Sequence, residues 1–527
     1  MLPNIELAAH VQHPEREHKG PTMTIYDQEA QWEQTDEMYR QLQGFVAEAV
    51  ARQELHEVEA ELFQRLLALG QALLRQFVAA SGTGYDPSQP LVTLDGQPLT
   101  YKGLQSVEYL SIFGSIQLSR AAYALPDGGY VYPMDEQWNR PEQKYSYLLQ
   151  KWLQAAASED DYREAAQRLQ ELLGLPLMAN VPQRLTQAVA AQVEPYYEQV
   201  EPPAPETEGS HLLISADGKG VRIVGPRQAD DEDDARPRRG KGQKRGTKKE
   251  AVVTVDASFD PEARDPEELV GTIMRGRTAA ERQRRQQERR RRREQGLPEP
   301  RAPQHAHVRA TLRGKDKAFG DLARRVHRRD PGGDKPMVVL IDGDPALEQG
   351  VRTALRAEGV GDRIDAVIAD LWHVMEYIWD VGTTLYGETN PHRTEWVEDK
   401  LRALLTGRVG RVIGGFRQML TKGRVTTAQK RALRKTITYL DNHRHMMAYD
   451  EYLAKGYPVA SGLIEGTCNS LVNDRMEQSG MRWSIDGAEA MLQQRAVKKN
   501  GDWNDFWEYR IDCERDRRYP ATYERAA

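Results

Sequence analysis

The sequence predicts an α/β fold in which a mixed five-stranded sheet carries helices and an α-helical insertion. A mainly helical N-terminal region with a small β element precedes it. Three observations predict this. Short apolar runs such as MVVLI at 337–341 are typical of buried strands. Longer segments with apolar residues three and four apart, typical of helices, alternate with them. A chain of 527 residues also exceeds what one core accommodates, so we expect several domains.

Composition narrows the class of protein. The chain has two cysteines, which excludes a disulfide framework or a cysteine-rich zinc site and fits a reducing cytosol. A mean hydropathy of −0.72 without a long apolar run excludes a membrane span, and the first residues lack the apolar stretch of a secretory signal. The formal net charge of −6 hides strongly basic blocks at 236–249 and 281–293. We therefore expect a cytoplasmic protein with local sites for phosphate contacts.

The N-terminal part divides by pattern. We expect residues 1–25 to be disordered and 26–89 to be helical, as a candidate dimerisation region. Residues 90–200 combine a small β element with two helices around a turn at Gly174. These helices fit either a DNA-contacting helix-turn-helix or a plain helical hairpin. The Pro- and acid-rich residues 201–210 predict a linker between domains.

The strand order then predicts an RNase H-like domain. HLLISAD, GVRIV, EAVVTVDASF, MVVLID and IDAVIAD are the five predicted strands, and a helix is expected over 306–329. The first part of this domain spans 211–386, with an Arg-rich insertion at 260–303. An α-helical insertion follows at 387–456, and the catalytic helix with the C-terminal part of the domain lies at 457–515.

Three acidic residues are the candidate catalytic and metal-binding groups. Asp217 and Asp342 close apolar runs, and Glu465 opens a helix. Carboxylates alone make an oxygen cage that suits Mg²⁺, and Mn²⁺ is expected to substitute. Two such ions activate a water or a 3′-hydroxyl and stabilise the leaving oxygen of a phosphodiester.

Asp217 also fits a structural role, and two nearby aspartates compete with Asp342 as the second metal ligand. Asp217 precedes Gly218, and Asp-Gly between two strands is also a hairpin turn. Asp344 precedes a proline, which predicts a helix N-cap and leaves Asp342 to bind metal. Asp370 lies at the next strand-to-helix junction, either as an N-cap or as a group supporting the metal ligands.

Glu465 also fits a charge that stabilises the first turn of a helix. Asn469 and Asn473 follow at four and eight residues, so a polar stripe shares its face and suits bound DNA. The buried side of the helix is assigned to apolar residues, namely Ile464, Leu471 and Val472.

Three residues after this helix are candidate DNA contacts. Arg475 and Arg482 can grip phosphate, and Trp483 can stack on a base or wedge into a distorted duplex. Alternatively, Trp483 packs in the core and Arg482 pairs with Asp486 or Glu489.

Four segments carry a resemblance to bacterial insertion-sequence transposases of the DDE class, in the Kra-type family, which is related to Mutator-like enzymes. They are SADGKGV at 215–221, LIDGD at 340–344, IADLWHVMEYIW at 368–379 and the block at 461–507. The resemblance covers 90–200 loosely and 211–510 well.

The resemblance implies an RNase H-like catalytic core, Mg²⁺-dependent cleavage of transposon ends and strand transfer into target DNA. It implies double-stranded DNA as partner, a homo-oligomer that is at least a dimer on DNA, and a nucleoid-associated location. It also places Asp370 and His373 beside the active site, where His373 would contact a phosphate; a core histidine next to Trp372 is the alternative.

One family element is absent. Members often carry a Cys-x-x-Cys-Gly element after the β-rich stretch, where this chain has Tyr123-Ala-Leu-Pro-Asp-Gly-Gly129. We therefore expect packing alone to stabilise that element. Two other functions share the predicted fold: a transposase-derived DNA-binding assembly protein without catalysis, and a hydrolytic nuclease without strand transfer.

Overall fold

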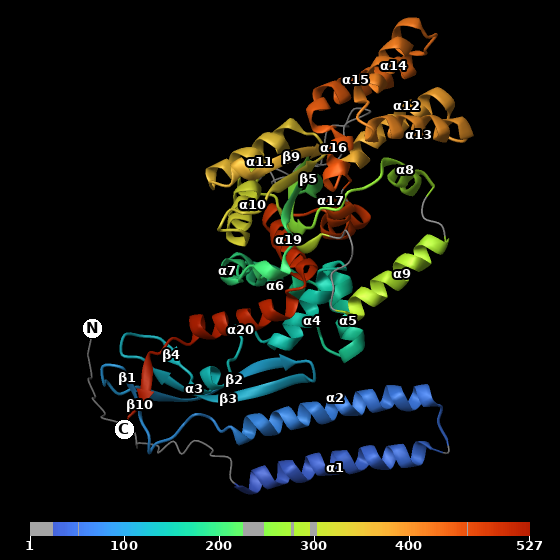
Figure 1. Cartoon of the computed structure of the whole chain (residues 1–527). Coiled ribbons are helices and arrows are strands. Elements are labelled where there is room, and N and C mark those ends of the chain that lie inside the picture. The colour runs from blue at the N-terminus through green and yellow to red at the C-terminus, as the bar shows by residue number, and fades with distance from the viewer. Residues whose placement is uncertain are drawn as a thin grey trace, which may run out of the picture. The chain divides into compact units, whose positions relative to one another are not determined.

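The computed structural model describes residues 25–50, 52–224, 247–275, 279–295, 303–460 and 462–526 (Figure 1). The chain divides into two compact units. The first combines residues up to 157 with 162–182 and 507–527. The second combines residues 158–161 with 183–506. The disorder predicted for 1–25 falls on residues that, except for Ile25, lie outside the described part of the chain.

The first unit begins with two antiparallel helices, α1 (Ile25–Ala49) and α2 (Leu55–Ala80), which confirms the helices predicted over 26–89. Glu54 and Glu57 form a capping box at the start of α2. Gln76 of α2 donates a hydrogen bond to the hydroxyl of Thr35, and both side chains are buried between the helices. The dimerisation role remains a prediction.

The predicted small β element is present in the first unit. Its antiparallel sheet has the order β2-β3-β4, and two further strands pair separately. The strands are β1 (Leu91–Thr93), β2 (Thr100–Ser111), β3 (Gly114–Ala124), β4 (Tyr130–Val131) and β10 (Tyr523–Arg525), which pairs with β1.

Packing holds the turn where the family often has cysteines. Backbone hydrogen bonds between Leu125 and Gly129 close it. The aromatic ring of Tyr123 is buried just before the turn, and a small apolar cluster forms around it. Backbone hydrogen bonds and apolar packing both contribute to holding this turn.

Helices complete the N-terminal half. They are α3 (Pro133–Gln137), α4 (Tyr147–Ala157), α5 (Tyr162–Leu173), α6 (Asn180–Ala190) and α7 (Val193–Gln199). The turn predicted between two helices is confirmed, because Gly174 follows α5 with φ of +66°, a left-handed conformation that favours glycine. Contact of these helices with DNA stays a prediction.

The second unit contains a mixed five-stranded sheet with the order β7-β6-β5-β8-β9. Strand β6 runs antiparallel to β5 and β7, whereas β5, β8 and β9 are parallel. The strands are β5 (His211–Ile223), β6 (Thr247–Phe259), β7 (Gln304–Thr311), β8 (Met337–Ile341) and β9 (Ile364–Ala369). The mixed α/β class and the number of strands agree with the prediction.

Two strand assignments were wrong. HLLISAD and GVRIV are one continuous strand, because β6 pairs with β5 along its whole length and Asp217–Gly218 is extended rather than a turn. Residues 304–311 form strand β7 instead of the first part of a helix, and the helix α10 begins at Lys315. Their alternating polar and apolar residues are the pattern of a strand with one buried face.

Helices cover the sheet and form the predicted insertions. Those of the Arg-rich segment are α8 (Pro266–Arg275) and α9 (Ala279–Glu294). Those around the parallel strands are α10 (Lys315–Arg329), α11 (Pro345–Ala357) and α12 (Leu371–Tyr386). The predicted insertion contains α13 (Pro391–Leu405), α14 (Val409–Lys422), α15 (Thr427–Asn442) and α16 (Tyr449–Lys455). Figure 1 shows α13, α14 and α15 gathered with α12, apart from α10 and α11.

The last helices of the chain begin with the one that carries Glu465. They are α17 (Gly462–Thr467), a π-helical turn (Cys468–Asn473), α18 (Asp474–Met476), α19 (Ile485–Asn500) and α20 (Trp503–Arg518). Residues 507–515, which were predicted to belong to the catalytic domain, lie in the first unit.

The segment 201–210 is not a boundary between compact units, because it lies inside the second one. Its backbone is fixed to the sheet: the amide of Gly209 donates to the Ser258 hydroxyl at 3.1 Å. The Glu208 carboxylate is buried and pairs with Arg329 at 2.6 Å and Lys335 at 2.7 Å. These ion pairs explain why a Pro- and acid-rich sequence does not behave as a free linker.

Among the helices of the described ranges, none combines the length and the apolar character needed to cross a membrane.

Candidate functional site

The candidate site begins where three parallel strands end in one row. Ala216 of β5 pairs with Ile341 of β8, and Ile341 pairs with Ala369 of β9. The next residue on each strand is acidic, namely Asp217, Asp342 and Asp370. Parallel strands bring their carboxyl ends to the same edge of a sheet, so the three carboxylates start from neighbouring backbone positions.

Asp217 is nearly buried, with 7% of its surface exposed. Its Oδ1 accepts a hydrogen bond from the amide of Gly218 at 2.7 Å. Its Oδ2 lies 3.1 Å from the ammonium of Lys219 and 3.3 Å from the thiol of Cys468, which donates to it. Burial lowers the pKa of Lys219, but the Asp217 carboxylate outweighs this and leaves it raised.

Gly218 leaves room for a side chain of the neighbouring strand. A Cβ atom there would meet the carboxylate of Glu250, which comes from the neighbouring strand β6. The Asp-Gly pair therefore reflects close packing between two strands rather than a turn.

Asp342 is poorly compensated. Its Oδ1 accepts a hydrogen bond from the amide of Asp344 at 2.8 Å, and its main-chain carbonyl accepts one from the Tyr439 hydroxyl at 2.7 Å. Burial raises the pKa of the Asp342 carboxyl, and the negative charge of Asp217 raises it further, while His373 acts in the opposite direction. Asp217, Asp342 and His373 thus lie close enough to affect one another's charge.

The capping arguments are confirmed. Asp344 is the N-cap of α11 and accepts from the amide of Ala346 at 2.9 Å; it also accepts from Lys315 at 3.0 Å. Asp370 is the N-cap of α12, accepts from the amide of Trp372 at 2.9 Å and is 2% exposed. Both aspartates therefore stabilise the first turn of a helix as N-caps.

Glu465 lies on α17 and is exposed. Cys468, which contacts Asp217, is three residues further on, so both side chains lie on the same face of the helix. Glu465 also contributes to raising the pKa values of Lys219 and Cys468. The structure thus brings Glu465 to the same edge of the sheet as Asp217.

A buried arginine holds this helix in place. The π-helical turn changes the ordinary pattern of backbone hydrogen bonds, and such turns are frequent at functional sites. Arg495 of α19 is 2% exposed and donates from Nε to the carbonyl of Leu471 at 2.8 Å. Its other nitrogens donate to the carbonyls of Ser470 and Ser158.

The three predicted ligands supply only oxygen atoms, and Asp217 and Asp342 face each other's negative charge. This chemistry suits a hard divalent cation. Within the described ranges, however, no three His, Cys, Asp or Glu side chains are arranged as a group that could hold a metal ion. The ammonium of Lys219 provides the positive charge next to Asp217 instead.

The polar stripe after Glu465 is present. The amide of Asn473 donates to the side chain of Asn469 at 2.8 Å, and Asn469 is exposed. The other side of the helix is buried, as predicted, through Ile464, Leu471 and Val472.

Two predicted DNA contacts need correction. Arg475 and Trp483 are 0% and 5% exposed, and the guanidinium of Arg475 lies 4.7 Å from the centre of the Trp483 ring. The indole of Trp483 donates to the carbonyl of Met476 at 3.3 Å. Trp483 also forms a β-bridge with Ile223, the last residue of β5. Arg475 and Trp483 are therefore part of the core and do not face DNA. The alternative that Trp483 packs in the core is confirmed.

The remaining candidates are accessible. Arg482 is exposed. His373 on α12 is half-buried, with its Nδ1 3.7 Å from Glu376. His373 lowers the pKa of Asp342, so it lies beside the strand ends that carry Asp217, Asp342 and Asp370 rather than inside the core.

Four residues of the site were not predicted from sequence: Lys219, Tyr439, Cys468 and Arg495. Two of them had a usable signal, since Lys219 is two residues beyond Asp217 on a strand and Cys468 is three beyond Glu465 on a helix. Tyr439 and Arg495 reach the site from distant helices and had none.

A scan against protein-family models and a search of curated proteins found no match for this chain. Function is therefore inferred from the side chains themselves.

Proposed function

We propose that this chain is a DDE-type transposase with an RNase H-like catalytic domain, which cleaves the ends of a DNA element and joins the 3′-hydroxyl to target DNA. One observation carries the proposal: Asp217 and Asp342 end neighbouring parallel strands, and Glu465 lies on the helix whose Cys468 contacts Asp217. The sheet order, with β6 antiparallel beside β5, supports the fold assignment.

Asp217, Asp342 and Glu465 would hold the metal ions, for which their oxygen-only chemistry is suited. Bound Mg²⁺ ions would lower the pKa of the attacking water or hydroxyl and stabilise the leaving oxygen. The ammonium of Lys219, 3.1 Å from the Asp217 carboxylate, would compensate its charge when no cation is bound.

Other side chains would position the ligands and the DNA. Tyr439 fixes the backbone of Asp342, and Arg495 fixes the helical segment after Glu465. His373 and Arg482 are placed to donate to phosphate oxygens. Asn469 and Asn473 offer a polar helix face for the strand backbone.

The test uses purified protein and labelled duplexes that carry the ends of the DNA element encoding it. We expect Mg²⁺-dependent cleavage, and we expect Asp342→Asn to reduce it by at least about 10³-fold while leaving DNA binding within about threefold. Asp344→Asn is the matched control, because asparagine is an equally good N-cap, and it retains full cleavage.

Three outcomes contradict parts of the proposal. Full cleavage by Asp342→Asn together with loss in Asp370→Asn would reassign the second carboxylate. Cleavage without joined products would indicate a hydrolytic nuclease. Binding of end DNA with no cleavage by the wild type in Mg²⁺ or Mn²⁺ would indicate an assembly protein.

A further inference from the structure

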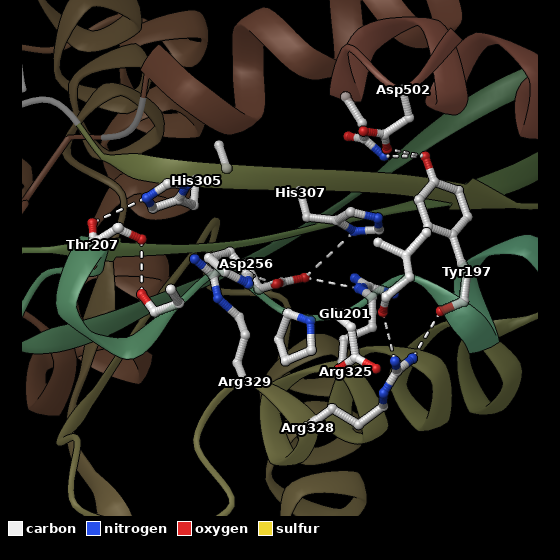
Figure 2. A pocket seen from close by; sticks show the side chains of 16 residues that line it. Tyr197, Glu201, Thr207, Asp256, His305, His307, Arg325, Arg328, Arg329 and Asp502 are labelled. Atoms are coloured by element: carbon white, nitrogen blue, oxygen red, sulfur yellow. Dashed lines mark hydrogen bonds and ion pairs between the residues drawn. The ribbon is translucent and has the colours of Figure 1, made fainter. Parts of the chain in front are cut away.

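The second unit contains a cavity of about 440 Å³ that the proposed function does not use. Strand β7, helix α10 and the segment that follows α7 surround it (Figure 2). Asp256, on β6, lies at its centre, and Pro202 and Pro203 are among the residues that line it. Cavities of this size accommodate small organic molecules.

Arginines dominate the charged lining. Arg325 and Arg329 pair with Asp256 at 2.8 and 2.9 Å. Arg328 donates instead to two main-chain carbonyls, those of Tyr197 and Val200, and has no carboxylate partner within the described part of the chain. The pocket therefore holds more guanidinium groups than its central carboxylate neutralises.

The acidic groups of the lining are already engaged or lie at the surface. Asp502 accepts a hydrogen bond from the Tyr197 hydroxyl at 2.8 Å. Glu201 is exposed to solvent. Asp256 is compensated by its two arginines, whereas Asp502 has a hydroxyl donor and burial raises its pKa.

Among the residues that line the cavity, two buried polar atoms have no hydrogen-bond partner in the described part of the chain: Nη2 of Arg329 and Nδ1 of His307. Nδ1 of His307 is 3.9 Å from Oδ1 of Asp256, which is beyond hydrogen-bond distance. Buried donors and acceptors are almost always satisfied, so an unsatisfied pair beside a cavity points to a missing polar group.

The backbone at this place is also irregular. The pairing of β6 with β7 shifts between Asp256 and Ser258, which indicates a β-bulge. His305 has φ of +48°, a conformation that is costly for a residue with a side chain. Its Nε2 lies 3.0 Å from the carbonyl oxygen of Thr207, so the irregular strand is tied to the segment over the cavity. Bulges are common beside binding sites.

We propose that this pocket binds a small organic anion, a phosphate or carboxylate group on a compact apolar body. Nε and Nη1 of Arg329 bind Glu208 and Asp256, which leaves its buried Nη2 to donate to either anion, and Arg328 adds positive charge without a carboxylate partner among the described residues. The prolines and Ala306 offer the apolar surface for the rest of the molecule. This site shares no lining residue with the strand ends that carry Asp217, Asp342 and Asp370.

Calorimetric titration of the full chain with phenyl phosphate, benzoate and benzyl alcohol tests the proposal, because the three probes share an aromatic body and differ in charge. We expect saturable binding of at least one anion, at least about tenfold tighter than the alcohol. A preference between the two anions identifies the head group. No saturable binding of either anion up to about 10 mM, or equal binding of the alcohol, overturns the proposal.

Three variants localise the binding. Arg329→Lys keeps the charge but removes the forked edge and should weaken the anion by at least about tenfold. Ala204→Trp fills the cavity from the covering segment without changing any charge, and it should block binding. Arg324→Lys is the matched control on the same helix, since Arg324 is exposed and pairs outside the cavity, and its affinity stays at the wild-type value. Unchanged affinity in a folded Ala204→Trp overturns the assignment even where Arg329→Lys does not fold.

Discussion

Two aspartates of the same sheet are buried under opposite conditions. Asp256 is held by Arg325 and Arg329, and although burial alone would raise its pKa, the positive charges around it lower the value to about 2. Asp342 receives one backbone amide, and burial together with Asp217 raises its pKa. The fold therefore supplies positive charge to Asp256 and a single backbone amide to the Asp342 carboxylate. That difference separates a structural carboxylate from a candidate catalytic one.

The largest expected effect tests this comparison directly. Asp256→Ala leaves the half-buried Arg325 without its carboxylate and the buried Arg329 with Glu208 alone, and it should lower the free energy of unfolding by about 3–5 kcal/mol. Asp342→Asn removes a charge that burial disfavours. It should leave the free energy of unfolding unchanged or raise it by up to about 1 kcal/mol. Urea denaturation of both variants at pH 7 measures the difference. Equal destabilisation would break the distinction between the two sites.

The dependence of stability on pH is a second test of this comparison, through His307 beside Asp256. Burial lowers the pKa of His307, Arg325 adds to this, and the value falls to about 3. Because the folded pKa lies below the unfolded one, acid protonates the unfolded chain first, and stability falls as the pH drops below about 6.5. Between pH 6.5 and pH 5 we expect a loss of about 1.5 kcal/mol from this residue.

His307→Gln removes that titration. The difference in free energy of unfolding between the wild type and the variant should therefore shrink or reverse across this range when measured by urea denaturation. A difference that does not change with pH would mean that His307 has the same pKa in the folded and the unfolded protein.

The smallest expected effect concerns the backbone of Asp342. Tyr439→Phe removes the hydroxyl that donates to its carbonyl and should lower the free energy of unfolding by about 1 kcal/mol. Tyr377→Phe is a suitable control, since its ring stacks on Tyr439 at 4.0 Å and the change preserves the stack. Thermal denaturation of the two variants compares them. Equal effects would show that the hydrogen bond to the Asp342 carbonyl contributes no more to stability than the neighbouring Tyr377 hydroxyl does.

The acidic strand ends were predictable because each follows a short apolar run and the N-cap rules separate Asp344 from Asp342. The continuous strand β5 was not, because Asp-Gly is a turn signal whose meaning changes when a neighbouring strand pairs through it. Arg475 and Trp483 look like a DNA-binding pair in sequence, yet they stack on each other inside the fold. Burial of this kind depends on β5, which is more than 250 residues earlier in the chain.

The π-helical turn also sets a constraint on insertions and deletions. It places one residue more in that turn than an α-helix has, with the carbonyls of Ser470 and Leu471 bound to Arg495. Deleting one residue there would restore regular α-helical winding, but it would rotate everything before it by about 100° relative to α19. Glu465 and Cys468 would rotate together and would no longer face Asp217. The segment 468–473 should therefore tolerate substitution far better than any change in its length.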